Sequence, residues 1–277
     1  MISNYSTMGQ YSLVLFQSGL NRKIISDASN CNANDISNYC LKYNIQTDFK
    51  ANNIIAYCCF KSIEYIRNIN KSLHLNFLLP NQIIVEDFNN LKGNLNDSWG
   101  VCNLLPTKLY KNSDKIIPER TILFNSNLME FNDKRLLEYM NDVAEFQKKE
   151  NIESSSHFLI KFVHEFAHSL HEGYLQQKFS ANKLNKIIHN FLDKNNILVF
   201  QKKYSDLITN NICRYASENP FESIACDLSK RILDKNNQSF KPYKKYFFLK
   251  SVLCKDEQKN DNQFNKLINE IWNGKIF

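Results

Sequence analysis

The chain has 277 residues, of which 43% are hydrophobic and 13% aromatic, so it is long enough for one large or two small packed domains. Its net charge is +7, but only six of the 35 basic residues are arginine. Because recognition of bases and phosphates favours the bidentate arginine fork, this lysine-rich balance argues against a nucleic-acid partner. No apolar run reaches the length of about 18 residues that a membrane-spanning helix needs.

The eight cysteines include no C-x-x-C pair, and the N-terminus lacks the pattern of a secretory signal. Residues 11–15 are apolar, but no Lys or Arg precedes them and no small-residue cleavage site follows. We therefore expect reduced thiols. The expected location is the cytoplasm, or a host cell that the protein enters by a route independent of a signal peptide.

Residues 1–75 are expected to form a separate N-terminal region of unknown role. Its predicted elements are a strand at 11–16, a helix at 34–43 with Asn34 as N-cap, and a longer helix at 54–69. No combination of residues with an evident chemistry occurs in it.

Residues 76–277 are predicted to form the second unit, of the α+β class. Short β-rich runs separated by Pro and Asn turns predict strands at 75–79, 82–88, 100–105 and 121–125. The strand at 121–125 is expected at the sheet edge. Helical periodicity predicts helices at 135–148, 154–171, 181–192, 199–208, 220–233, 243–253 and 263–272. We expect a short twisted sheet packed on the 154–171 helix, with a mostly helical C-terminal part.

The 154–171 helix contains a His-Glu-x-x-His motif at His164, Glu165 and His168. Histidines at i and i+4 lie on one helical face, where both imidazoles can reach one zinc ion. The flanking residues are apolar, and unpaired polar groups are costly in a buried helix, so zinc binding is favoured over two satisfied core histidines. Glu165 is then the expected general base. The run Ser154-Ser155-Ser156 offers an N-cap, and Gly173 is expected to stop the helix.

A catalytic zinc site needs a third protein ligand. A third histidine ten residues after the first is absent, because that position is Tyr174. Downstream, Asn219 and Pro220 are favourable N-cap and first helical residues, which places Glu222 in the first turn. Glu222 could close a capping box with Asn219. We favour metal ligation because the two-histidine site otherwise lacks a ligand.

The two motifs, His164-Glu165-x-x-His168 and Tyr215-Ala-x-x-Asn-x-x-Glu222, together resemble the gluzincin zinc metallopeptidases. The resemblance is closest to the catalytic domain of anthrax lethal factor and related bacterial toxin and effector peptidases. In element order it covers about residues 80–235. It implies a zincin-like fold, with His164, His168 and Glu222 as Zn²⁺ ligands, Glu165 as base, and the Tyr215 hydroxyl donating to the oxyanion. Tyr215 could instead be a core aromatic residue at a helix entry.

The resemblance further implies an endopeptidase that acts on a protein or peptide, such as a host protein cleaved by a bacterial toxin or effector. We expect a monomer. Gluzincins commonly carry an acidic residue four positions after the ligand glutamate, where this chain has Cys226, followed by Asp227. Either residue is a candidate to support a ligating histidine. His171, seven residues after His164, is a further candidate, either as a contact of this site or as an ordinary polar residue.

The departure at Cys226 motivates an alternative function, that of a catalytically inactive, zinc-stabilised binding or regulatory protein. A third alternative, a basic nucleic-acid-binding protein, is motivated by charge alone.

Overall fold

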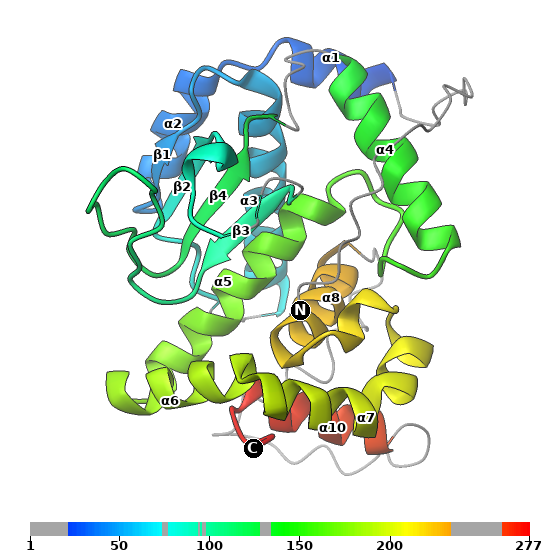
Figure 1. Ribbon diagram of the computed structural model, residues 1–277. Helices are drawn as coiled ribbons and strands as arrows, with labels where there is room; N and C mark the ends of the chain where they lie inside the picture. Colours follow the sequence, from blue (N-terminus) through cyan, green and yellow to red (C-terminus); the bar gives the residue numbers. More distant parts are fainter. Residues whose placement is uncertain (1–21, 74–76, 94, 96–97, 128–133, 234–261) are drawn as a thin grey trace.

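A computed structural model describes residues 22–73, 77–93, 95, 98–127, 134–233 and 262–277 (Figure 1). The predicted strand at 11–16 and the predicted helix at 243–253 lie outside these ranges. The described residues form an α+β fold, with a small mixed sheet and a larger helical part.

The sheet has four strands, β1 (Gln46–Asp48), β2 (Gln82–Glu86), β3 (Gly100–Asn103) and β4 (Thr121–Asn125), in the spatial order β1-β2-β4-β3. β1 and β4 pair with β2 in parallel, and β3 pairs with β4 antiparallel. The expectation that 121–125 forms the edge was therefore wrong. β4 has a neighbour on each side and all five of its residues are buried, whereas β3 lies at the edge.

Two other strand predictions also need correction. β1 was missed because three residues are too few to show a period. Residues 77–79, the described end of the predicted 75–79 strand, are not extended into the sheet. β2 ends at Glu86, and the chain turns into a short 3₁₀ helix, η1 (Phe88–Asn90), whose first turn is capped by the Asp87 side chain.

The described helices are α1 (Arg22–Ser29), α2 (Ala33–Leu41), α3 (Asn53–Leu73), α4 (Lys134–Lys149), α5 (Ile160–Lys178), α6 (Ala181–Leu192), α7 (Lys194–Asn211), α8 (Pro220–Leu233) and α10 (Asn262–Trp272). Most of them were predicted, because amphipathic runs are local signals, but α1 was missed and α7 extends beyond the predicted 199–208 at both ends. The cap of α2 is Asn32 rather than Asn34, since the Asn32 side chain accepts the Asn34 amide at 2.8 Å.

The motif helix α5 differs from its prediction at both ends. It begins at Ile160, and its N-cap residue Leu159 makes no side-chain cap bond. It also continues through Gly173, which is helical and buried. A Cβ at that position would lie 3.0 Å from Leu78 Cβ and 3.3 Å from Arg120 Nε. This glycine therefore allows close packing rather than ending the helix.

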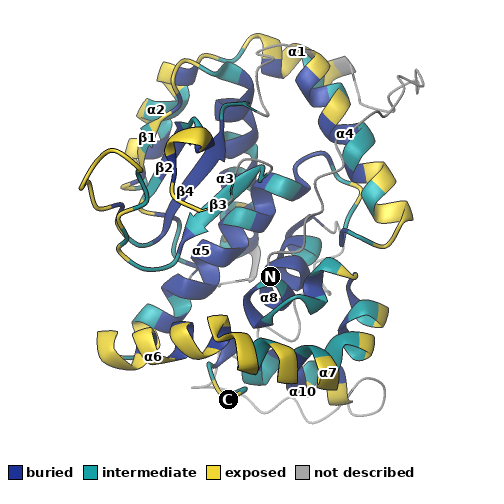
Figure 2. Ribbon diagram, viewed as in Figure 1, coloured by how far each residue is buried: buried dark blue, intermediate teal, exposed yellow. Residues whose placement is uncertain are grey.

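α5 lies at the centre of the described fold, between the sheet on one side and α8 on the other (Figure 1). Phe162 on α5 packs against Phe124 on β4 with ring centroids 4.5 Å apart. Most of α5 is buried, whereas α6 exposes one side (Figure 2). One hydrophobic core contains residues from both sides of position 75, and β1 pairs with β2 across the same position. No helix in the described ranges is long and apolar enough to span a membrane.

Candidate metal centre

The two motif histidines lie on the face of α5 that packs against α8. Their Nε2 atoms are 3.1 Å apart, and their rings are nearly perpendicular, at 84°. His164 and His168 are only 4% and 7% exposed. The i, i+4 spacing thus places both imidazoles at one point in the interior, as predicted.

α8 supplies the third group. The Asn219 side chain accepts the Glu222 amide at 3.0 Å, which is the predicted N-cap, and this cap places Glu222 in the first turn. Glu222 Oε2 lies 2.9 Å from His164 Nε2 and 3.5 Å from His168 Nε2. Its carboxylate therefore faces the histidines, as the ligand hypothesis requires.

The three side chains form a group that can hold a metal ion. Their ligand atoms are 2.9, 3.1 and 3.5 Å apart. Atoms that ligate one tetrahedral zinc at about 2.0–2.1 Å are separated by about 3.4 Å. Two of the three observed distances are slightly shorter than this, and the third is close to it. Two imidazoles and one carboxylate are also a donor set typical of catalytic zinc.

The electrostatics of the group favour a bound positive charge. Burial acts to raise the pKa of Glu222, but His168 and His164 hold it far below its usual range. Burial acts to lower the pKa of His164, but the hydrogen bond and charge of Glu222 raise it to about 9. These pKa directions favour a positive charge at the site, either a proton or a metal ion, beside an ionised carboxylate.

The expected base and oxyanion donor lie next to the same group. Glu165 is half-buried on α5, and burial raises the pKa of its carboxyl above the usual value. A Cβ added to Gly100 of β3 would lie 2.8 Å from Glu165 Cγ, so the edge strand packs directly on this side chain. Tyr215 begins the 3₁₀ turn η3 (Tyr215–Ser217), and its ring centroid is 5.6 Å from that of His164. Glu222 and burial raise the pKa of Tyr215 well above its usual value, so the phenol remains a donor.

Of the residues considered as support for the two histidines, Cys226 is the one that contacts His164. Its Sγ lies 3.7 Å from His164 Nδ1 and 4.0 Å from an oxygen of Glu153. The neighbouring Asp227 carboxylate accepts a hydrogen bond from Arg231 Nε at 2.8 Å. Glu153 was not predicted from the sequence, because an acidic residue in a loop between two helices belongs to no motif. Glu153, His164 and Cys226 make up a second group with potential metal ligands.

His171 belongs to a packing contact instead. Its ring stacks on Trp272 of α10 at 4.8 Å, and its Nε2 lies 3.2 Å from the Trp272 carbonyl oxygen. Burial lowers the pKa of His171 to about 3, so this imidazole is neutral. Another carboxyl, Glu218, lies between η3 and α8, where burial and the charge of Glu222 raise its pKa to about 7.

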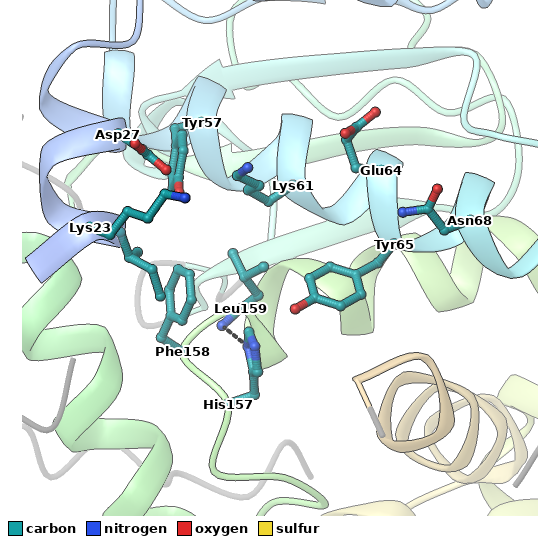
Figure 3. Close-up of a pocket in the computed structure, with 11 residues that line it drawn as sticks. Lys23, Asp27, Tyr57, Lys61, Glu64, Tyr65, Asn68, His157, Phe158 and Leu159 are labelled. Atoms are coloured by element: carbon teal, nitrogen blue, oxygen red, sulfur yellow. Dashed lines mark hydrogen bonds between the residues drawn. The ribbon is translucent and has the colours of Figure 1, made fainter. Parts of the chain in front are cut away.

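A separate cavity of about 430 Å³ lies between α1, α3 and the segment before α5 (Figure 3). Nothing in the sequence predicted this cavity. Its lining combines Lys23 and Lys61 with Asp27 and Glu64, and none of the candidate metal ligands on α5 or α8 contributes to it.

The chain matches no known protein-family model, no curated protein and no solved structure. Assignment of a function therefore depends on the residues and geometry of the site.

Proposed function

We propose that the protein is a zinc-dependent endopeptidase of the gluzincin type with a zincin-like fold. The observation that carries this proposal is the convergence of His164, His168 and Glu222 within 3.5 Å of one another. Glu165 and Tyr215 on adjoining elements add the groups that peptide hydrolysis requires. The resemblance to toxin peptidases extends the proposal to a substrate protein of a host cell.

Zinc held by the three ligands would supply Lewis-acid polarisation of the scissile carbonyl and acidify a water molecule. Glu165 takes the proton from the attacking water and delivers it to the leaving amine. The Tyr215 hydroxyl donates a hydrogen bond to the developing oxyanion. No side chain is acylated, because water is the nucleophile.

The substrate is proposed to bind as an extra strand on β3. This strand is the edge of the described sheet that adjoins α5, and its Gly100 packs on Glu165. An extended peptide paired with β3 by main-chain hydrogen bonds would therefore run past the catalytic base. The strand at 121–125, which was expected at the sheet edge, is interior and has no free side for a substrate strand.

Metal analysis of the purified chain tests the ligand set. We expect about one zinc per chain. His168→Ala and Glu222→Ala should lose it, while His189→Ala, which removes an exposed histidine on α6, should retain it. Full retention in Glu222→Ala would instead point to Glu218 as the third ligand, and no zinc in the wild type would refute the proposal.

Peptide profiling tests the activity. Wild type and Glu165→Gln are each incubated with cell lysate, and new N-termini are sequenced. We expect cleavage products that disappear in Glu165→Gln while its zinc content stays unchanged. Indistinguishable profiles with zinc bound in both would favour the alternative, a zinc-stabilised binding or regulatory protein, which the cysteine at position 226 motivates.

A further inference from the structure

The two ring nitrogens of His164 have different surroundings. Nε2 faces His168 and Glu222, whereas Nδ1 faces Cys226 Sγ at 3.7 Å. An imidazole that ligates a metal through Nε2 carries its proton on Nδ1. That N–H needs an acceptor, which in metal sites is usually a carboxylate, a carbonyl or water.

Cys226 is a weak acceptor, but it is connected to a stronger one. Its thiol can donate to Glu153 Oε1, 4.0 Å away, and both side chains are fully or almost fully buried. His164 Nδ1, the Cys226 thiol and the Glu153 carboxylate therefore lie in series, 3.7 and 4.0 Å apart, so that Nδ1–H can donate to the sulfur and the thiol to the carboxylate.

Glu153 is held rigidly enough to orient this chain. Its Oε1 accepts the Ser154 amide at 2.8 Å and the Ser154 hydroxyl at 3.2 Å, and its Oε2 accepts Lys161 Nζ at 2.8 Å. Ser154 thus fixes the Glu153 carboxylate instead of capping α5.

The loop that carries Glu153 is itself anchored to the segment that carries Tyr215. The Arg214 amide donates to the Asn151 carbonyl at 2.8 Å, and the Tyr215 amide donates to the Ile152 carbonyl at 3.2 Å. These backbone bonds couple the position of the loop to that of the expected oxyanion donor.

We propose that Glu153, acting through the Cys226 thiol, is a positioning residue for His164. The inference depends on the proposed function, since it takes His164 to be a zinc ligand. It assigns to a loop before α5 the negative charge that gluzincins commonly place on the helix of the ligand glutamate. The same three residues could instead ligate a second metal ion. Positioning is favoured because Lys161 already occupies Glu153 with a positive charge.

Zinc affinity, measured by competition with a chromogenic chelator on the full chain, tests the proposal. Changing Glu153 alone would leave the Lys161 ammonium without its buried partner, so the variant used is Glu153→Gln with Lys161→Met. We expect about 10- to 100-fold weaker zinc binding, the usual effect of losing such support. Lys161→Met alone, which keeps the carboxylate, is the matched control and should bind zinc more tightly than the double variant.

Substitutions at Cys226 separate positioning from a merely structural effect. In the Cys226→Ala background, the Glu153 change should alter zinc affinity less than about threefold, because the connection is already broken. In the variant with Glu153→Gln and Lys161→Met, adding Cys226→Asp should restore most of the zinc affinity, because it places a carboxylate beside His164 Nδ1. Two results would overturn the proposal. One is a zinc affinity within twofold of wild type in the Glu153→Gln, Lys161→Met variant. The other is that the Glu153 change lowers zinc affinity as much in the Cys226→Ala background as in wild type.

A measurement on the zinc-loaded wild type covers the case in which these variants do not fold. NMR of ¹⁵N-histidine protein should show a hydrogen-bonded Nδ1 proton on His164 that shifts in Cys226→Ser. An unchanged resonance would contradict the relay. Stoichiometry above one zinc per chain, with the excess lost in Cys226→Ala, would identify a second metal site instead. Absence of any zinc would refute the proposed function itself, which is a different result.

Discussion

At the scale of single residues, the interior beside the site holds a carboxyl group and a guanidinium that are incompletely paired. Glu172, one turn after His168 on α5, is fully buried, and it accepts a hydrogen bond from Gln176 at 3.2 Å. Within the described residues, Glu172 Oε2 and Arg120 Nε have no hydrogen-bond partner. Burial raises the pKa of Glu172 to about 9, with Glu119 adding to the effect and Arg120 opposing it.

The raised pKa predicts a pH-dependent stability. Because the folded chain retains a proton that the unfolded chain releases near pH 4.5, folding is favoured most below that pH and loses stability as pH rises toward 9. The loss approaches about 1.4 kcal/mol per pH unit. Glu172→Gln should remove this slope, so denaturant titrations between pH 5 and 9 should show wild type weakening relative to the variant. Parallel curves would mean that Arg120 keeps Glu172 ionised, and Glu150→Gln, at an exposed position, is the control.

At the scale of elements, the contact between β3 and α5 limits the position of Glu165, the proposed base. Gly100 lies against Glu165, and its added Cβ would also come within 3.1 Å of Phe124 Cδ1. Consecutive residues of a strand face opposite sides, so Val101 points away from Gly100's side and packs on a small cluster around Phe88 and Leu123. Cys102 shares the side of Gly100 and packs against the main core, and Gly100 is the residue of the edge strand that lies against Glu165.

Gly100→Ala should therefore displace Glu165 without touching the metal ligands. Overpacking of this kind costs about 1–3 kcal/mol in the free energy of unfolding. We expect cleavage to fall at least tenfold in a peptide assay while the zinc content remains at one per chain. Val101→Ala, on the opposite face of the same strand, should retain both. Equal activity of Gly100→Ala and wild type would show that the strand does not constrain the base.

At the scale of the whole molecule, the C-terminal helix is tied to the far half of α5. Trp272 is fully buried and stacks on both His171 and Tyr174 at 4.8 Å. It also meets the Phe77 ring edge-on at 6.3 Å. α10 therefore completes the core on which α5 is held, which explains why His171 is a packing residue.

Trp272→Ala should remove this anchor and lower the free energy of unfolding by about 3–5 kcal/mol. Chemical denaturation measures the change. Lys266→Ala, at an exposed position of the same helix, should stay within about 0.5 kcal/mol of wild type. A loss below 1 kcal/mol in Trp272→Ala would mean that α10 contributes little to the stability of the chain.

The sequence by itself determined the parts of the protein that depend on near neighbours. The spacing of His164 and His168 and the cap of Asn219 on the Glu222 amide are local, so helical geometry fixes them. The bounds of α6, α8 and β4 were predicted for the same reason. Glu222 lies in the first turn of α8, as predicted, because its cap is local. Its role as a metal ligand stays a prediction.

Only the tertiary structure decided what depends on residues far apart in the chain. β4 is central because β3, which comes before it in sequence, pairs with its outer side. Glu153 lies 73 positions from Cys226, and no periodicity links them. α5 runs through Gly173 because Leu78 and Arg120 pack on it from other segments. These contacts form only when elements distant in sequence pack together, so the helix and strand propensities of short segments do not predict them.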